Sequence, residues 1–484
     1  MNLKSISLNV GKALLVNALF MFLSVIISVG YGFDEAFTPL LISFSVTFLT
    51  GAFPFIFVRK AIRMNLKEGY TTMVLAWMLS FLFGMLPYVL YGGEFTLVNA
   101  WFESVSGYTT TGSTILTDIE SLPRSLLFWR SSTHFIGGLG TVVFLLLILS
   151  DASPVRFRLT SLEISELSRN GYKYKAGATV RVMLSVYVML TLAETLLLWA
   201  AGMNLFDAVN HSFSTVSTGG FSTRNASVMS YDSRAIDLII LVFMVLSSMH
   251  FGVIFSVFTR GSLTPLKSSV TKYYGCVIAF LSLAVTLVML LEGGYTSIGR
   301  AVLDSTFQVV SYLSTTGFGQ ADNAAWPVLA NLILLYAAFH CGCSGSATGG
   351  IKADRMLVAI KEIRNEFNRR MRPSSVVKSR IDGVVLRNDA VSSVFLFIVT
   401  YVFVMVISFI VLLMCGVDVD VAFSGTLSSV GNVGHGIGRI GTIGNFNFLT
   451  SVPKIVFTMD MVLGRLEIFP VLVVISMLFH RGDK

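Results

Sequence analysis

Long apolar runs separated by short polar stretches follow one another along the whole chain. The runs lie at about residues 11–31, 38–58, 71–91, 126–150, 179–201, 234–258, 272–293, 326–359, 391–415 and 452–480. A helix rises about 1.5 Å per residue, so roughly 20 apolar residues cross a hydrocarbon layer about 30 Å thick. The pattern therefore predicts ten crossings and an all-α polytopic membrane protein.

Four of the polar stretches are short and rich in Ser, Thr and Gly. They follow the third, fifth, seventh and ninth apolar runs. Segments of about 12 to 15 such residues are too short and too polar to span a bilayer, but they suit re-entrant half-helices between two crossings. We expect each of them to enter the membrane from the extracellular side and return to it.

The four polar stretches align on a glycine. Their sequences are VNAWFESVSGYTTTGST, DAVNHSFSTVSTGGFST, DSTFQVVSYLSTTGFG and VAFSGTLSSVGNVGHG. The aligned glycines are Gly112, Gly220, Gly317 and Gly434, and the residues six positions before them are Ser106, Ser214, Ser311 and Ser428. Because the glycines lie 108, 97 and 117 residues apart, the chain is a fourfold repeat of crossing, polar dip and crossing.

Such a repeat is typical of a cation pore. Non-helical backbone at membrane depth is tolerated where it is buried in protein or faces a water-filled cavity, and its carbonyl oxygens replace the water of a dehydrated cation. The preceding half-helix points its negative end at the same axis. The alternative is close helix packing by small residues, but four copies in register favour a pore. The predicted selectivity filter consists of Thr110, Thr111, Gly112, Thr218, Gly219, Gly220, Thr315, Thr316, Gly317, Asn432, Val433 and Gly434.

The repeat also predicts the organisation of the chain. We expect four pseudo-symmetric units, each with a first crossing, a pore helix and a second crossing, around one central pore, plus two extra N-terminal transmembrane helices. The predicted boundaries are a two-helix hairpin at 1–68, pore unit 1 at 69–152, pore unit 2 at 153–262, pore unit 3 with an intramembrane loop and a basic cytoplasmic loop at 263–388, and pore unit 4 at 389–484.

The eighth apolar run is interrupted by CGCSGSATGGIK, from Cys341 to Lys352. Glycine costs a helix about 1 kcal/mol relative to alanine, so the helix should break inside the membrane. Unwound backbone is allowed there if it lines the aqueous path, which favours a barrier below the filter. A kink that serves helix packing is the alternative. The predicted gate residues in this segment are Gly342, Cys343, Gly345, Ser346, Thr348, Gly349 and Gly350.

The last apolar run contains Arg465, and a charge is costly at that depth. Glu467, two positions on, points to another helix face and does not pair with it across one turn. At about 6 Å and an effective dielectric near 20, the arginine would repel a cation by roughly 3 kcal/mol. We therefore add Arg465 to the gate. The alternative is a structural ion pair with Glu194 in the fifth crossing or with Glu467 of another element.

Composition and charge agree with a membrane protein. Of 484 residues, 54% are hydrophobic and 13% charged, against roughly 25% charged in soluble domains, and the mean hydropathy is +0.76. With a cytoplasmic N-terminus, 27 of the 35 Lys and Arg fall on inside segments, so both termini should be cytoplasmic. The inside loop at about 352–388 holds ten basic and four acidic residues. It suits a cytosolic partner or anionic membrane lipid, and positive-inside bias explains it equally well.

Other function classes are less consistent with the sequence. The net charge of +8 is not gathered on a soluble domain, which argues against nucleic acid. The four cysteines lie in apolar runs, and we find neither a Walker motif nor HExxH or GxSxG, so we expect no organic cofactor and no enzyme activity. A carrier with inverted repeats is disfavoured because all four units run in the same direction. Three intramembrane histidines allow either proton-linked transport or equivalent packing: His134, His250 and His340.

The four filters, the crossings around each of them and the string VLGRLEIFP resemble the Trk/Ktr/HKT superfamily of potassium transporters. The two additional N-terminal crossings resemble its Trk-type membrane subunit, and the resemblance covers essentially the whole chain. Glycine at all four filter positions goes with potassium selectivity in that family. The resemblance thus implies potassium as the transported ion, held by the carbonyls of Thr111, Gly112, Gly219, Gly220, Thr316, Gly317, Val433 and Gly434.

The same resemblance implies an intramembrane gating loop at the glycine-rich segment and an obstructing arginine at Arg465. It also implies a homodimer, a cytosolic nucleotide-binding regulatory ring of RCK type (TrkA-like) and a place in the bacterial cytoplasmic (inner) membrane. Potassium uptake through a gated, channel-like filter is therefore the expected function. A symporter coupled to protons or sodium, with alternating access, is the alternative.

Overall fold

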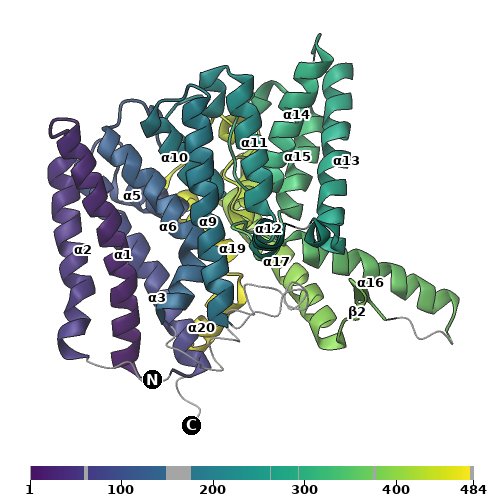
Figure 1. Cartoon of the computed structure of the whole chain (residues 1–484), viewed down its shortest axis with the longest axis horizontal. Helices are drawn as coiled ribbons and strands as arrows, with labels where there is room; N and C mark the ends of the chain where they lie inside the picture. Colours follow the sequence, from purple (N-terminus) through teal and green to yellow (C-terminus); the bar gives the residue numbers. More distant parts are fainter. Residues whose placement is uncertain are drawn as a thin grey trace.

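The computed structural model describes residues 2–58, 64–148, 176–261, 263–292, 294–373 and 378–479. Nearly all regular structure in this part of the chain is helical. The exception is a short antiparallel hairpin of two strands, β1 (Arg380–Ile381) and β2 (Val384–Val385). Figure 1 shows most helices side by side along one direction, as in a bundle that crosses a membrane.

The first two helices form a hairpin at one edge of the molecule (Figure 1), α1 (Leu3–Gly30) and α2 (Phe37–Phe57). They pack closely because glycines face each other: a side-chain carbon on Gly51 would lie 3.1 Å from the carbonyl oxygen of Gly11. The inner side of α1 packs on α3 and α6 of the first pore unit. The hairpin therefore adds to the outside of the bundle and does not interrupt the repeat.

Each of the four repeats contains a long helix, a short pore helix and at least one helix that follows the pore helix. The first comprises α3 (Leu66–Gly84), α4 (Leu86–Tyr91), α5 (Leu97–Tyr108) and α6 (Arg124–Ile148). The second comprises α9 (Ala176–Ala200), α10 (Leu205–Val216), α11 (Arg234–Ser248) and α12 (Phe251–Arg260).

The third repeat comprises α13 (Ser269–Leu291), α14 (Ile298–Leu313), α15 (Val328–His340) and α16 (Ala353–Met371). The fourth comprises α17 (Asn388–Met414), α18 (Val419–Gly431), α19 (Ser451–Arg465) and α20 (Phe469–Phe479). Short 3-10 turns join some of these helices: η1 (Ser227–Tyr231), η2 (Thr264–Lys267), η3 (Asn323–Ala325) and η4 (Gly438–Ile440). The pore helices of the four repeats are thus α5, α10, α14 and α18.

Six described helices are long and apolar enough to cross a membrane, or seven if α11 and α12 count as one bent span. Large apolar side chains are exposed on the outer faces of such helices, for example Leu49 (67% exposed), Phe280 (70%) and Leu396 (58%). Exposed apolar surface of this extent requires a lipid environment or a partner. The helices therefore form a multi-pass membrane bundle.

Three of the predicted second crossings are broken. The sixth run was expected to be one helix, but α11 and α12 meet at an angle of 106°. The tenth was also expected to be continuous, but α19 ends at Arg465 and α20 begins at Phe469, and the intervening Glu467 and Ile468 have φ of 58° and 52°. Hydropathy alone missed both breaks because the residues at them include apolar ones that continue the pattern.

The eighth run breaks between Cys341 and Lys352, as the glycines predict. Its second part differs from expectation, because α16 is a polar helix with charged residues along it. Figure 1 shows α16 leaving the bundle sideways at the end where α20 and the start of α1 also lie. The predicted crossing to residue 359 is therefore half a crossing, α15, followed by the loop and a surface helix.

Some expectations concern residues outside the described part of the chain. The predicted boundary between units 1 and 2 at 152/153 and the unit 2 boundary at 262 lie there. Several predicted cytoplasmic basic residues lie there as well: Arg59, Lys60, Arg63, Arg156, Arg158, Arg169, Lys173, Lys175, Arg481 and Lys484.

Candidate functional site

The four aligned glycines lie against one another's filter segments. A side-chain carbon on Gly112 would overlap the carbonyl oxygen of Gly219 in the second filter. The same relation joins three more pairs: Gly220 with Thr316, Gly317 with Val433, and Gly434 with Thr111. Since the fourth filter returns to the first, the segments close a ring around one axis, with repeats 1, 2, 3 and 4 in sequence order.

The backbone repeats the same conformation in all four filters. Each aligned glycine has a positive φ, of 83°, 82°, 73° and 95° in chain order. The residue two positions earlier is left-handed too, with φ of 54° to 57°: Thr110, Thr218, Thr315 and Asn432. Glycine adopts such angles readily, whereas in other residues they raise the conformational free energy. The four peptide segments are therefore equivalent in path as well as in position.

The serines six positions before the glycines anchor each filter to its pore helix. Their carbonyl oxygens accept the N–H of the residue before the glycine, at 2.8–3.0 Å, in the pairs Ser106 with Thr111, Ser214 with Gly219, Ser311 with Thr316 and Ser428 with Val433. Two hydroxyls also reach the residue after the glycine, Ser106 Oγ to Ser113 O at 2.6 Å and Ser311 Oγ to Phe318 O at 2.7 Å. In the first and third filters the serine therefore binds both ends of the filter.

All twelve predicted filter residues are buried in the ring. The helices α5, α10, α14 and α18 end directly at it, so the negative ends of their dipoles meet there. Backbone carbonyls arranged around an axis are the ligands that replace water on a dehydrated monovalent cation. The chemistry that this arrangement supports is therefore cation binding and passage.

A buried ion pair holds the first and second filters together. Arg130 Nε lies 2.6 Å from Glu103 Oε1, and the two side chains are 2% and 0% exposed. Glu103 also accepts the hydroxyl of Thr114 and the N–H of Ile115, and Arg130 Nη1 donates to Ser222 O at 3.0 Å. This pair was not predicted from the sequence. Arg130, a charged residue inside the fourth apolar run, could have indicated it.

The three intramembrane histidines have unlike surroundings. His134 Nδ1 lies 3.2 Å from Ser214 Oγ, and His340 Nε2 lies 2.9 Å from Tyr273 Oη. His250 caps α12, because its Nδ1 accepts the N–H of Gly252 at 2.9 Å. Each ring is engaged with its own local partners, which favours the packing interpretation over a proton relay.

The loop from Cys341 to Lys352 fills the bend between α11 and α12. Cys343 N donates to Ser248 O at 2.9 Å, and Phe251 N donates to Gly345 O at 3.0 Å. These bonds satisfy backbone groups that a helix leaves open at its ends. The bend in α11–α12 and the break after α15 are therefore complementary parts of one structure.

The same loop lies directly against the fourth filter. A side-chain carbon on Gly349 would lie 2.6 Å from Asn432 Oδ1 and 2.9 Å from Gly431 O, and one on Gly350 would overlap Cys341 Sγ. The predicted gate residues of the loop are buried except for Ser346, which is half-buried. A side chain at Gly349 would therefore collide with Asn432 and the end of α18, and one at Gly350 would collide with Cys341 within the loop.

Arg465 connects the loop to the first repeat. Its Nη1 donates to Ala347 O at 2.6 Å and its Nη2 donates to Gly137 O of α6 at 2.8 Å, and the residue is 7% exposed. A buried guanidinium carries a positive charge, which repels a cation nearby. Arg465 therefore joins the loop to α6 and places a buried positive charge beside both.

Glu467 forms ion pairs at the C-terminal end of the loop. It accepts from Lys352 Nζ at 2.6 Å and from Arg355 Nη2 at 2.7 Å, so the end of the loop, the start of α16 and the break before α20 are joined. The two-residue spacing predicted that Glu467 does not pair with Arg465, but it did not indicate these partners. The signal available was a basic pair at the end of the glycine-rich segment.

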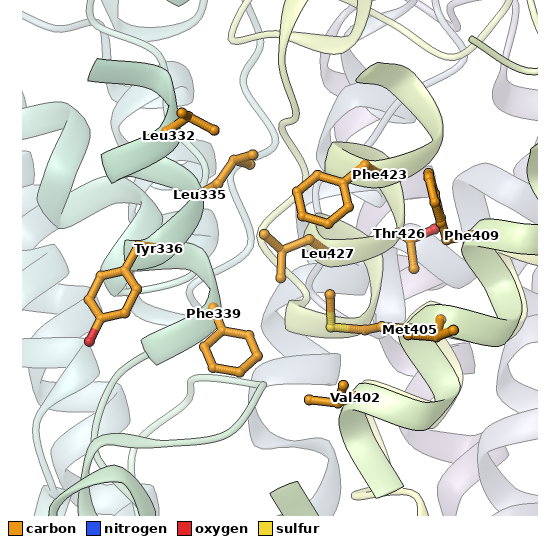
Figure 2. Close-up of a pocket in the computed structure, with 11 residues that line it drawn as sticks. Leu332, Leu335, Tyr336, Phe339, Val402, Met405, Phe409, Phe423, Thr426 and Leu427 are labelled. Atoms are coloured by element: carbon orange, nitrogen blue, oxygen red, sulfur yellow. The ribbon is translucent and has the colours of Figure 1, made fainter. Parts of the chain in front are cut away.

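A cavity of about 360 Å³ lies outside the ring, between α15, α17 and α18. Figure 2 shows that its walls are almost wholly apolar. Thr426 contributes a hydroxyl that has no hydrogen-bond partner. The lining residues are Leu332, Leu335, Tyr336, Phe339, Val402, Met405, Val406, Phe409, Phe423, Thr426 and Leu427. An apolar cavity gives a cation no ligands, so it lies off the ion path.

Comparison with known proteins agrees with this geometry. The sequence model of the TrkH family, whose description is "Cation transport protein", matches residues 40–483 of this chain. The chain belongs to the TrkH family. Because the members of this family are transport proteins, the chain is a transport protein and not an enzyme.

Curated relatives match most of the chain. The Trk system potassium uptake protein TrkH of Escherichia coli (strain K12) is 34% identical over 388 residues, 80% of each chain. TrkG of the same organism is 32% identical over 80% of each chain, and TrkI of Halomonas elongata is 34% identical over 401 residues, 81% of this chain and 80% of that one.

A solved structure has the same fold. The crystal structure of the potassium transporter TrkH from Vibrio parahaemolyticus superposes with a TM-score of 0.89 at 30% identity, covering 99% of this chain and 100% of that one. The predicted all-α, multi-pass membrane fold of a Trk-type subunit is thereby confirmed.

Proposed function

We propose that this TrkH-family protein carries potassium into the cell through the ring of four filters. The closed ring, in which each aligned glycine lies against a carbonyl oxygen of the next filter, supports this proposal most directly. The curated relatives are named as potassium uptake proteins. The proposed ligands are the carbonyl oxygens of Thr111, Gly112, Gly219, Gly220, Thr316, Gly317, Val433 and Gly434.

In this proposal the loop after α15 and Arg465 form the gate. The loop touches the fourth filter through Gly349, and the arginine holds the loop through Ala347 O. A cation leaving the filter meets the buried backbone of the loop and the positive charge of Arg465. Opening then requires the loop to move away from the ring, and the conduction is channel-like.

We place the protein in the bacterial inner membrane with both termini in the cytoplasm. Uptake is then driven by the membrane potential, at about 2.3 kcal/mol per charge per 100 mV. The start of α1, α16 and α20 lie at one end of the bundle (Figure 1). The basic residues of α16 fit a cytoplasmic location.

We also propose a homodimer in membrane lipid and a cytosolic nucleotide-binding ring of RCK type as the regulator. The projecting helix α16 and the β1–β2 hairpin are surfaces from which such a partner reaches the gate, since α16 follows the loop directly. The division of the chain into an N-terminal hairpin and four pore units, with boundaries at residues 68, 152, 262 and 388, is also part of what we propose. Potassium flux with and without the purified ring protein tests the partner.

Rubidium uptake into proteoliposomes tests the function. Vesicles loaded with potassium and placed in low potassium should accumulate radioactive rubidium, and sodium-loaded vesicles should accumulate much less. Single-channel currents in planar bilayers should accompany the flux. Uptake that saturates without such currents and that requires a proton or sodium gradient would instead support a symporter.

A further inference from the structure

The side chain at the left-handed position differs in one of the four filters. The first three filters carry a threonine there, and the fourth carries Asn432. An amide is longer than a hydroxyl and has two N–H donors. Asn432 Nδ2 donates to Thr111 Oγ1 at 3.0 Å and to Met461 O at 2.9 Å. One side chain therefore binds the first filter and helix α19 together.

The carbonyl end of the same amide faces the gate. Asn432 Oδ1 is buried without a hydrogen-bond partner. It would lie 2.6 Å from a side-chain carbon on Gly349 and 2.9 Å from one on Gly464. Gly349 belongs to the loop, and Gly464 directly precedes Arg465. The amide thus lies between the filter, the loop and the arginine that tethers the loop.

We propose that Asn432 is a positioning residue that couples the gate to the selectivity of the filter. Movement of the loop carries Gly349 away from Asn432 Oδ1 and so changes the space around the amide. The amide in turn holds Thr111, whose carbonyl oxygen lies against Gly434. The spacing between the first and fourth filters therefore depends on where the loop is. This inference rests on the proposed function and adds to it a role for a side chain, beyond that of the backbone ligands.

Threonine does not replace these contacts. Its hydroxyl is a single donor on a shorter side chain, so it does not bridge Thr111 and Met461. Asparagine also tolerates the left-handed conformation better than most residues, which allows φ of 56° at this position. The departure of the fourth filter from the threonine pattern is thus explained by its contacts with α19 and the loop.

The first test replaces the amide. Asn432→Thr gives the fourth filter the residue of the other three and should lower the potassium-to-sodium permeability ratio, measured from reversal potentials, about fivefold, as expected for a lost buried hydrogen bond. The matched control is Thr426→Val on the same pore helix, which removes a buried hydroxyl that has no partner. The control should keep the wild-type ratio. An unchanged ratio in Asn432→Thr overturns the inference.

The second test displaces the loop by a substitution where it contacts His250, away from Asn432. In Gly345→Ala the new methyl would lie 2.6 Å from the ring of His250, so it displaces the loop without touching Asn432. In the wild-type background this variant should change both the flux and the permeability ratio. In the Asn432→Thr background it should change the flux alone.

The outcomes separate this inference from the proposed function. An equal shift of the permeability ratio in both backgrounds, or a change in flux with no change in ratio in the wild-type background, overturns the coupling and leaves the gate standing. An unchanged flux in both backgrounds contradicts the gate itself, and the coupling with it.

Discussion

At the scale of single residues, the filter is specified by backbone geometry. Gly112 has φ of 83°, and a side-chain carbon on it would overlap the carbonyl of Gly219. The positive φ and the close carbonyl both disfavour any residue other than glycine at this position. The same two conditions recur at the other three aligned glycines. The glycine pattern was therefore visible in the sequence, because backbone conformation leaves a direct mark on residue type.

Gly112→Ser should lower the potassium-to-sodium permeability ratio about tenfold, since a left-handed non-glycine residue costs roughly 1–2 kcal/mol and the side chain displaces the carbonyl of Gly219. Reversal potentials in proteoliposomes measure the ratio. Gly92→Ser is the matched control, because Gly92 has the same φ of 83° and no atom within 4 Å of the added carbon. Equal ratios in the two variants would count against a filter role for Gly112.

Arg465→Ala should raise potassium flux, by up to about a hundredfold, because it removes a repulsion of roughly 3 kcal/mol and the tether to Ala347 O. Arg387→Ala serves as the control, since that side chain is 80% exposed and pairs with Asp389 at the surface. Flux in liposomes that stays at the wild-type value in a folded Arg465→Ala protein would contradict the electrostatic barrier.

Side-chain partners were harder to predict than backbone roles. The sequence suggested Arg465 as a pore residue but gave no sign that it binds one carbonyl of the loop and one of α6. The bridge made by Asn432 was likewise hidden. Most of these contacts join residues more than a hundred positions apart, for example Arg465 with Ala347 and Asn432 with Thr111. A single sequence does not show which of its distant residues come together in the fold.

At the scale of elements, broken helices build the site. The bend between α11 and α12 depends on the loop after α15, because backbone groups at the bend form hydrogen bonds with backbone groups of the loop. The glycine-rich break was predictable from composition. The breaks at Met249 and after Arg465 were not, since they depend on tertiary partners and the hydropathy pattern runs through them.

Deletion of residues 345–349 should raise potassium flux, because it removes the backbone that lies against the fourth filter at Gly349. Flux should rise without the regulatory partner. Elution as a single species and an unchanged helical circular dichroism spectrum establish that the variant is folded. A folded variant that remains closed would identify the loop as a packing element.

Glu103→Gln should destabilise the protein by about 3 kcal/mol or more, because it leaves the buried guanidinium of Arg130 without its counter-charge. Thermal unfolding in detergent measures the loss. Glu120→Gln is the control, since Glu120 is 43% exposed in its ion pair with Arg224 and such pairs contribute little. A loss no larger than that of the control would contradict the scaffold role of the Glu103–Arg130 pair.

At the scale of the whole molecule, four sequence repeats about a hundred residues apart become four sides of one ring. The repeat predicted the number of units and the direction of each. It did not predict the apolar cavity beside α18 (Figure 2). Nor did it predict that α16 leaves the bundle, because the apolar run extends past the point where the span ends.

Anomalous diffraction from crystals grown in rubidium tests the central claim most directly, since it locates a potassium substitute without relying on transport. We predict an anomalous peak on the axis enclosed by the carbonyls of Thr111, Gly219, Thr316 and Val433, and its loss when sodium replaces rubidium. Crystals that diffract well and show no peak within the ring, while the same protein takes up rubidium in liposomes, would contradict the account.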